Sequence, residues 1–267
     1  MKTLKELMNL HGRVAVITGG GGHIGSAICE ALAELGAVIV VIDTVKESCS
    51  KVTMQIRERY AVETLELMTD LTDEKRLRTV PKTVLDSFGR LDILVNCAAL
   101  GGASKLKGWN TPFQEQRSDT CRLALEVNLM APFILVQSCA KALATSGHGS
   151  VINIGSIYGM VGPDMQLYEG TTMGNPAAYA ASKGGLLQLT RWLAVVLAPD
   201  VRVNAITPGG VWRKQPEVFH KRYVARTPLM RMATEEDLKG AAAYLASDLS
   251  AYVTGHNLVV DGGWTVW

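Results

Sequence analysis

Three side chains of this sequence have the chemistry to share the handling of one proton. Ser156 follows a short apolar segment, and Tyr179 and Lys183 come later in the segment Tyr-Ala-Ala-Ser-Lys. Residues four apart lie on one face of a helix, so we expect the ammonium of Lys183 beside the phenol of Tyr179. A neighbouring cation favours the phenolate and should lower the pKa of Tyr179 from about 10. The phenol could then exchange a proton with a substrate oxygen held by the Ser156 hydroxyl.

A glycine-rich turn near the N-terminus has the composition of a pyrophosphate-binding site. An expected strand over 13–18 runs into Thr-Gly-Gly-Gly-Gly-His-Ile-Gly, and a helical pattern follows. Such glycines let the backbone approach the phosphates, whose charge the helix N-terminus favours. A flexible turn without a ligand is the weaker alternative, because a strand precedes the turn and a helix follows it. The residues expected to contact a dinucleotide here are Gly19, Gly22, His23, Ile24 and Gly25.

Two acidic residues follow the next two expected strands. Asp43 could accept hydrogen bonds from both ribose hydroxyls of NAD and would repel the 2′-phosphate of NADP, so the sequence favours NAD over NADP. Its alternative role is the N-cap of a helix. Asp70 could bond an adenine amino group, with Leu71 beside it, or could cap the following helix, and the sequence does not separate these two roles.

Short β-branched segments alternate with longer helical patterns along the whole chain. This alternation predicts an α/β fold, a single doubly wound Rossmann domain over 1–267 with a seven-stranded parallel sheet and helices on both faces. Gly36 and Gly89 are placed to end helices, and Thr234 with Asp237 resembles a capping box. Strands are expected over 13–18, 37–42, 63–68, 91–95, 150–154, 201–206 and 257–260. Helices are expected over 24–35, 46–60, 74–88, 118–144, 177–197 and 235–246.

The composition excludes several classes of protein. Apolar residues make up 48% and charged residues 19% of the 267 residues, which excludes a disordered chain. The net charge of +2 gives no electrostatic reason to expect a nucleic acid or an anionic membrane as partner. We expect neither a membrane-spanning helix, which needs an apolar run of ~18 residues, nor a secretory signal. Five cysteines without a CxxC pair indicate neither disulfides nor a metal site, and favour a reducing cytoplasm.

In the order and context of these motifs, the chain resembles the short-chain dehydrogenase/reductase superfamily, in its branch of about 250 residues. The residues that carry the resemblance are the turn 18–25, Asp43, Asp70, the segment 96–99, Asn128, Ser156, Tyr179 with Lys183, Pro208 with Gly209, and the closing segment 260–263. Two departures are His23 in place of glycine and Asn-Cys-Ala-Ala in place of the commoner Asn-Asn-Ala-Gly. Both put the geometry of the cofactor site in doubt, and neither touches the proton-transfer residues.

The resemblance implies a role for each matching residue. Tyr179 is the general acid/base, and Lys183 lowers its pKa and bonds the nicotinamide ribose. Ser156 orients the substrate oxygen, and Asn128 orders a water that links Lys183 to solvent. A buried Asn128 that joins two strands through its amide is compatible with that role. Around the cofactor, Asn96 and Ala98 pack near a ribose, and Pro208, Gly209 and Val211 line the nicotinamide.

Three long segments are expected to form the substrate site: 101–117, 160–176 and 212–230. Their polar groups and their aromatic residues Trp109, Tyr168 and Trp212 suit a hydroxylated ring, and their basic residues suit phosphate. The turn, the loop before Tyr179 and the closing Val-Asp-Gly-Gly-Trp-Thr-Val-Trp also resemble oxidoreductases of bacterial surface-sugar modification, including the flagellin-glycan group. A sugar or sugar-nucleotide alcohol is therefore the expected substrate. The alternative for these segments is a dimer contact or an ordered surface.

Other functions and the assembly complete the expectations. The enzymatic alternatives are a 3-oxoacyl thioester reductase and a polyol or gluconate dehydrogenase, and the non-enzymatic alternative is an NAD-sensing regulator.

The helix expected over 177–197 is apolar on much of its circumference, which favours burial beyond its own sheet. The family resemblance extends this to a homotetramer. Trp264 and Trp267 are expected to contact a neighbouring subunit or to cover its substrate site.

Overall fold

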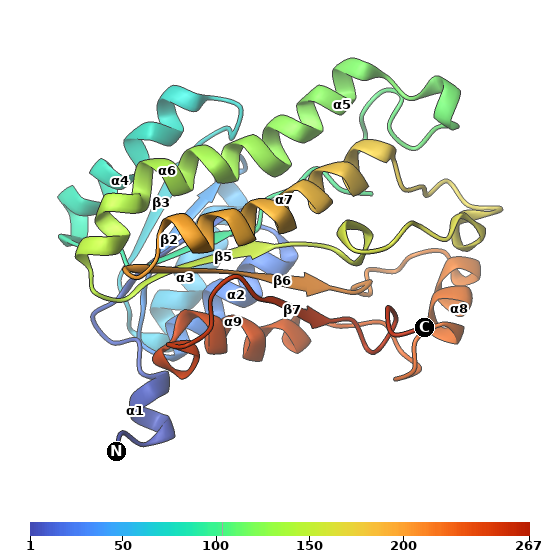
Figure 1. The fold of residues 1–267 in the computed structure, drawn as a ribbon. Helices are drawn as coiled ribbons and strands as arrows, with labels where there is room; N and C mark the ends of the chain where they lie inside the picture. The colour runs from blue at the N-terminus through green and yellow to red at the C-terminus, as the bar shows by residue number, and fades with distance from the viewer. Residues whose placement is uncertain (103) are drawn as a thin grey trace.

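The computed structural model describes residues 1–102 and 104–267, and its centre is a parallel sheet of seven strands (Figure 1). The strand order is β3-β2-β1-β4-β5-β6-β7, with the reversal between β1 and β4 that a doubly wound sheet requires. The α/β fold class and the seven strands expected from the sequence are confirmed. The strands are β1 (Val14–Thr18), β2 (Val38–Asp43), β3 (Thr64–Met68), β4 (Ile93–Asn96), β5 (Gly149–Ile154), β6 (Val201–Pro208) and β7 (Asn257–Val260).

Alternate side chains of each strand pack into two separate cores, one on each face of the sheet. In β1, Ala15 and Ile17 pack on one face, whereas Val14 and Val16 pack on the other, and all four are buried. Burial on both faces explains why the central strands are apolar without interruption. Helices α2 (His23–Glu34), α3 (Lys46–Tyr60) and α9 (Lys239–Ala246) cover one face, and α4 (Glu74–Phe88), α6 (Ala131–Thr145) and α7 (Ala177–Val196) cover the other (Figure 1).

The helix ends follow the expected signals. Helices α3 and α4 have the predicted bounds, α2 begins and ends one residue earlier than predicted, and α7 ends one residue earlier. Gly36 and Gly89 have φ of +96° and +73°, in the left-handed region that a glycine adopts without strain. Thr234 and Asp237 form the predicted capping box, although the first turn after it, η5 (Glu235–Leu238), is a 3₁₀ turn that precedes α9.

The long helix expected over 118–144 is interrupted in its middle. It consists of α5 (Ser118–Leu125), a π-helical turn η2 (Glu126–Met130) and α6. Such turns carry one extra residue and often lie at functional sites. The stretch Ser118–Thr145 has the length and apolar composition of a membrane span, contrary to the sequence expectation, but α6 contributes Ile134, Leu135 and Val136 to the core above the sheet. Burial against the sheet accounts for this apolar character.

Two helices escape the sequence reading. The first is the five-residue α1 (Leu4–Met8), which projects from the body of the protein with no buried residue (Figure 1). The second is α8 (Glu217–Ala225), which lies inside the segment 212–230 that was expected to be a loop. Its two buried side chains, Phe219 and Tyr223, lie four residues apart, and a single pair of this kind does not establish a helical period in the sequence.

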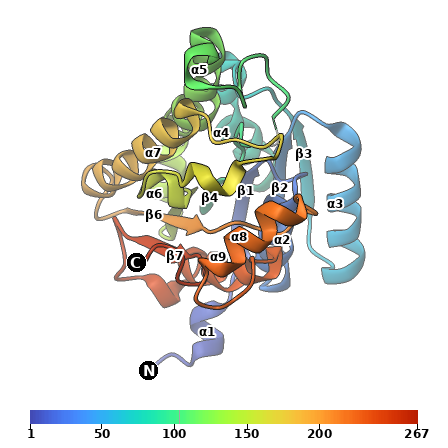
Figure 2. The same cartoon turned by 90° about the vertical axis from the view of Figure 1, so that its right-hand side faces the viewer.

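The three long segments gather at one end of the molecule. They emerge beyond the carboxyl ends of β4, β5 and β6, on the right of Figure 1 and facing the viewer in Figure 2, together with the C-terminus. They contain the short turns η1 (Phe113–Glu115) and η4 (Met165–Tyr168), and α8. The turn η3 (Ile157–Gly159) directly precedes the segment 160–176, and η6 (Asp248–Ser250) lies before β7. Parallel strands present their carboxyl ends to one side, which is where ligands of such sheets bind.

Candidate active site

A cavity of about 510 Å³ lies beyond the carboxyl ends of the central strands. Its walls come from the turn after β1, the end of β2, the residues after β3, β4 and β5, and the start of α7. The glycine turn and the Tyr-Lys pair, which the sequence places far apart, therefore share one cavity. Of the residues expected at a cofactor, those that line it are Gly19, Gly22, His23, Ile24, Gly25, Asp43, Asp70, Leu71, Ala98, Tyr179, Lys183 and Pro208.

The glycine turn is packed so closely that side chains are excluded from it. Gly19 has φ of +65°, and a Cβ there would lie 2.8 Å from Cα of Ala98. A Cβ on Gly25 would overlap the carbonyl oxygen of Gly19. The small Ala98 and the two glycines thus bring the first turn of α2 against the end of β4. This leaves the helix N-terminus, which favours anions, open to the cavity.

His23 is the first residue of α2, and it has helical backbone geometry. The replacement of glycine by histidine therefore requires no left-handed backbone here. The N-cap before it, Gly22, has φ of −83°. A histidine at this position causes little backbone strain, because any L residue adopts a helical φ unless a proline follows it. The imidazole is largely exposed, and its Nδ1 lies 3.7 Å from Oε1 of Glu235.

The two acids have distinct local partners. Asp43 Oδ2 accepts a hydrogen bond from the backbone N–H of Gly21 at 3.1 Å, and its Oδ1 accepts from Thr44 N at 2.7 Å. It thus ties β2 to the glycine turn while lining the cavity. Asp70 Oδ1 accepts from both the N–H and the hydroxyl of Thr72, at 2.9 and 2.8 Å. The N-cap of α4 is Asp73, so the capping role weighed for Asp70 is wrong.

Tyr179 and Lys183 line the other end of the cavity, and Ser156 lies beside Tyr179. Ser156 follows β5, and its hydroxyl accepts from Tyr158 N at 3.2 Å and hydrogen-bonds to the phenol of Tyr179. Lys183, one turn after Tyr179 in α7, donates from Nζ to the carbonyl oxygen of Ile154 at 2.6 Å. The same Nζ lies 6.0 Å from the centre of the Tyr179 ring. The expected juxtaposition of a phenol, a hydroxyl and an ammonium is present.

The expected direction of the Tyr179 pKa is wrong for this structure. Burial raises the pKa of Tyr179 more than the hydrogen bond from Ser156 lowers it. Lys183 does not reverse this shift, because its ammonium is directed to Ile154 O and is itself buried. Burial lowers the pKa of Lys183 to about 8. The phenol is therefore in its protonated form at neutral pH, ready to donate.

Asn128 joins the π-helical turn to two other segments. Its Oδ1 accepts from Leu100 N at 2.8 Å, and its Nδ2 donates to Leu100 O at 3.1 Å and to the Ser182 hydroxyl at 3.0 Å. The side chain is buried. It holds the loop after β4 against the helix of Tyr179 and Lys183, so the expected structural amide is present but joins a loop to a helix and not two strands.

A family comparison adds independent information. A sequence model described as enoyl-(acyl carrier protein) reductase matches residues 21–265. Cis-4-hydroxycyclohexanecarboxylate dehydrogenase from Sinomonas cyclohexanicum is 33% identical over 258 residues, which is 95% of this chain and 96% of the relative. Galactitol 2-dehydrogenase from Cereibacter sphaeroides is 32% identical, over 98% of this chain and 99% of its own. Post-translational flagellin modification protein A from Campylobacter coli is 28% identical, over 96% and 99%.

The chain belongs to the short-chain dehydrogenase/reductase superfamily. Solved structures agree with this assignment. The short-chain dehydrogenase from Leptospira borgpetersenii with bound NAD⁺ superposes with a TM-score of 0.84 at 32% identity, over 99% of this chain and 96% of that one. Gluconate 5-dehydrogenase from Burkholderia cenocepacia, in complex with NADP and tartrate, superposes with a TM-score of 0.87 at 28% identity, over 99% and 100%.

This short-chain dehydrogenase is an NAD(P)-dependent oxidoreductase that acts on CH–OH groups. Its own geometry fits a dinucleotide. The glycines form a cradle that a Cβ at Gly19 or Gly25 would fill, and Asp43 carries a carboxylate at the adenosine end. Tyr179 and Lys183 stand at the other end.

Some expected cofactor residues lie outside the cavity. Asn96 is buried in the sheet, where its Nδ2 donates to Asn153 Oδ1 at 2.8 Å. Gly209 packs against Asp261 and the Tyr223 hydroxyl, and Val211 is buried beside its bridge partner Ala233. None of these three residues lines the cavity.

Arg213 lines the cavity although sequence reasoning did not place it at the cofactor. Among the sequence expectations it belongs only to the basic residues of the segment 212–230. The available signal was its place five residues after Pro208, in the first turn of chain beyond β6. Since the ends of parallel strands converge, a charged residue so soon after a central strand lies near the ligand edge.

The expected substrate residues differ in how they are placed. The indole of Trp109 is buried, and its N–H donates to Gly101 O at 2.8 Å, so it supports the loop after β4 and offers no open surface. The expectation that it contacts substrate is therefore unsupported. Tyr168 hydrogen-bonds through its hydroxyl to Tyr158 at 2.8 Å. Trp212 is exposed and packs on His220, with ring centres 4.4 Å apart.

The two C-terminal tryptophans have separate environments. Trp264 is buried within its own subunit, stacked on Tyr223 with ring centres 5.9 Å apart. The expectation that it contacts a neighbour is wrong, because this aromatic cluster already covers it. Trp267 is exposed, with its indole N–H donating to Arg226 O at 3.1 Å.

Proposed function

We propose that this short-chain dehydrogenase interconverts a secondary alcohol and a ketone of a sugar or sugar nucleotide in surface-glycan biosynthesis, with Tyr179 as general acid/base. A bound nicotinamide supplies or accepts the hydride. The phenol of Tyr179 passes the accompanying proton to or from the substrate oxygen. The observation that carries the substrate class is a set of buried, partly unpaired polar groups next to Tyr179.

The proton-handling residues have complementary tasks. The Ser156 hydroxyl, already bonded to Tyr179, holds the substrate oxygen beside the phenol. Lys183 places a cation in the same buried site, where it favours developing negative charge. Asn128 fixes the spacing between the loop after β4 and α7, and so positions Tyr179 and Lys183.

The polar set beside Tyr179 begins with two phenols. Tyr158 and Tyr168 share a hydrogen bond. Tyr168 also lies close enough to Tyr179 that a negative charge on the Tyr168 phenol would raise the pKa of Tyr179. Asn175 also hydrogen-bonds to Tyr168. Its Oδ1 is buried, and no residue that the structure describes donates to it. An unpaired buried acceptor is costly, so a ligand hydroxyl is the natural partner.

The indole N–H of Trp264 is a second such group. It is buried, it packs edge-on to Tyr158 at 6.1 Å between ring centres, and it has no acceptor within the described residues. A donor and an acceptor on either side of the Tyr158–Tyr168 pair suit a substrate with several hydroxyl groups. An acyl chain would leave all of these groups unpaired.

A substrate panel tests this function. We expect turnover, followed at the nicotinamide absorbance, on sugars or sugar nucleotides, and less on cyclohexanol, which has one hydroxyl. In Asn175→Ala, kcat/KM should fall about tenfold for the polyhydroxy substrate, because one hydrogen bond is lost, and should stay the same for cyclohexanol. Turnover of 3-oxoacyl thioesters alone would overturn the sugar assignment, and turnover of free polyols or gluconate alone would favour the polyol alternative.

Asp43 supports NAD as the preferred cofactor. Its carboxylate lines the cavity at the end of β2, where it would repel a 2′-phosphate. We expect kcat/KM to be higher with NAD than with NADP. Asp43→Ser should reduce this difference, because it weakens the binding of NAD and removes the repulsion of the 2′-phosphate of NADP. Steady-state rates with both cofactors measure this. An unchanged ratio in Asp43→Ser would show that another residue sets the preference.

A homotetramer in the cytoplasm remains our proposal for the assembly and its location. Large apolar side chains stay exposed on two neighbouring helical segments, α5 with η2, and α7. They are Leu123, Leu125, Met130, Trp192, Val195 and Val196. Exposed apolar groups gathered in this way favour burial against a second copy.

A further inference from the structure

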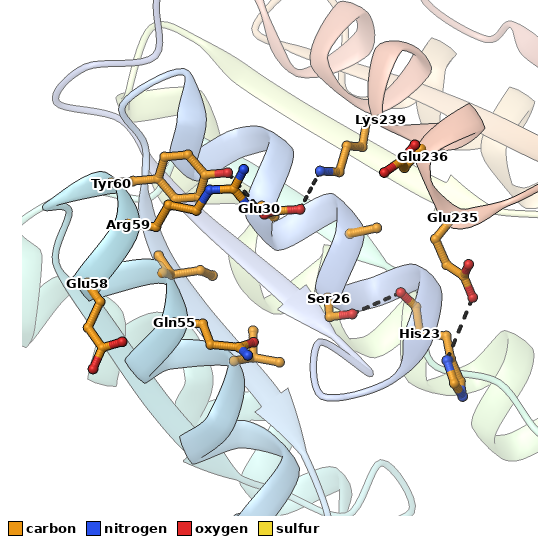
Figure 3. Close-up of a pocket in the computed structure, with 13 residues that line it drawn as sticks. His23, Ser26, Glu30, Gln55, Glu58, Arg59, Tyr60, Glu235, Glu236 and Lys239 are labelled. Atoms are coloured by element: carbon orange, nitrogen blue, oxygen red, sulfur yellow. Dashed lines mark hydrogen bonds and ion pairs between the residues drawn. The ribbon is translucent and has the colours of Figure 1, made fainter.

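An arginine, a glutamate and a histidine from separate segments meet at the rim of the cofactor cavity. The guanidinium Nε of Arg213 donates to Glu235 Oε1 at 3.3 Å, and His23 Nδ1 lies 3.7 Å from the same oxygen. His23 begins α2, Arg213 follows β6, and Glu235 begins η5. Figure 3 shows the His23–Glu235 contact from the side of a second, outer cavity of about 740 Å³ between α2, α3 and η5.

Arg213 lines the dinucleotide cavity, Glu235 lines the outer cavity, and His23 lines both. The wall of the dinucleotide cavity also includes Gly19 and Gly22, and Glu235 is not part of it. The carboxylate therefore contacts Arg213 from the side of the outer cavity. In the outer cavity Glu30, the other central acid in Figure 3, is already paired with Lys239 and Arg59.

The Arg213–Glu235 contact is easily exchanged. Both side chains are about a third exposed, and ion pairs of that kind contribute little stability. The backbone of Arg213 is held separately, because its N–H donates to Gln215 Oε1 at 2.7 Å and Gln215 Nε2 donates to Val211 O at 2.8 Å. The guanidinium can change partner without movement of the chain that carries it.

A pyrophosphate at the glycine turn offers Arg213 a stronger partner. It carries two negative charges, and the guanidinium matches phosphate oxygens with two parallel N–H donors. We propose that Arg213 binds the pyrophosphate of the dinucleotide, and that Glu235 is an internal anion that competes with it for Arg213. The dinucleotide displaces Glu235 from Arg213 and so fixes the start of the segment 212–230 against the cofactor.

Binding of two cofactor fragments to the full chain tests this exchange. ADP-ribose contains the pyrophosphate and adenosine lacks it. In Arg213→Ala, the Kd for ADP-ribose measured by calorimetry should rise at least about tenfold, and the Kd for adenosine measured by ligand-observed NMR should not change. In Glu235→Gln, the Kd for ADP-ribose should fall, since the competing charge is gone. Arg76→Ala is the matched control, an exposed arginine on α4 that also faces one carboxylate.

Each outcome decides the proposal. An unchanged Kd for ADP-ribose in Arg213→Ala overturns it, and so does an equal loss for both fragments, because that result places the effect in folding. Weaker binding of ADP-ribose by Glu235→Gln would mean that Glu235 positions Arg213 for the pyrophosphate. That result would also overturn the proposal that the two anions compete for Arg213. Thermal unfolding of each variant, with Arg213→Lys as a milder change, separates these results from a damaged fold. None of them depends on which alcohol the enzyme oxidises.

Discussion

Replacing Tyr179 by phenylalanine is expected to lower kcat by about 10²–10⁴-fold, the usual contribution of a positioned general acid/base. The substitution removes one hydroxyl and leaves the ring. This hydroxyl hydrogen-bonds to Ser156, and the ring that carries it lies 6.0 Å from Nζ of Lys183 in the same helix. Binding of NADH, measured by its fluorescence, should persist, because the glycine turn and Asp43 are untouched.

Tyr252→Phe is the matched control, since that phenol is fully exposed and remote from the cavity. It should leave kcat unchanged. A Tyr179→Phe protein that keeps its turnover would contradict the assigned role. A protein without turnover in either form, but with NADH-dependent binding to another macromolecule, would favour the NAD-sensing alternative.

The pH dependence follows from the raised pKa of Tyr179. To oxidise an alcohol, the phenol must first lose its proton, and burial holds that proton on. The oxidation rate should therefore rise from neutral toward alkaline pH, whereas ketone reduction, which uses the protonated phenol, should not. Tyr179→Phe should flatten this rise. The comparison of both directions in wild type and variant checks the sign.

The sequence predicts the sheet well because its signals are local and redundant. Segments such as Val38–Asp43 are apolar throughout, are bounded by glycines or acids, and alternate with amphipathic helices, so only a doubly wound sheet accommodates them. Gly36 and Gly89 mark helix ends through backbone chemistry alone. The helix α8 escapes because its packing partners, such as Trp264, are distant in sequence.

The site is predictable in membership and less so in its energetics. Residues at strand ends converge by topology, which is why Asp43 and Tyr179 share one cavity with the turn and Ser156 lies beside Tyr179. The pKa of Tyr179 could not be read from its spacing to Lys183. Burial and the direction of the ammonium toward Ile154 decide it, and both depend on packing. Trp109 illustrates the same limit, since loop packing buries a residue that composition suggests for a ligand.

Gly25 offers the second large effect, on stability and cofactor binding together. In Gly25→Ala the new methyl group would overlap the carbonyl oxygen of Gly19 and come within 3 Å of Gly20 Cα, all of it backbone. The turn must therefore open. We expect a loss of about 1–3 kcal/mol in the free energy of unfolding, as for overpacked cores, and a rise of at least tenfold in the Kd for NADH.

Gly240→Ala is the matched control for that substitution. Gly240 is the second residue of α9, and a Cβ there meets nothing within 4 Å. Alanine should stabilise the protein by about 0.5–1 kcal/mol, because a helical glycine costs backbone entropy, and should leave the Kd for NADH unchanged. Denaturant unfolding and NADH titration measure both quantities. If Gly25→Ala behaves like Gly240→Ala, the close packing of α2 against the turn is not what forms the cofactor site.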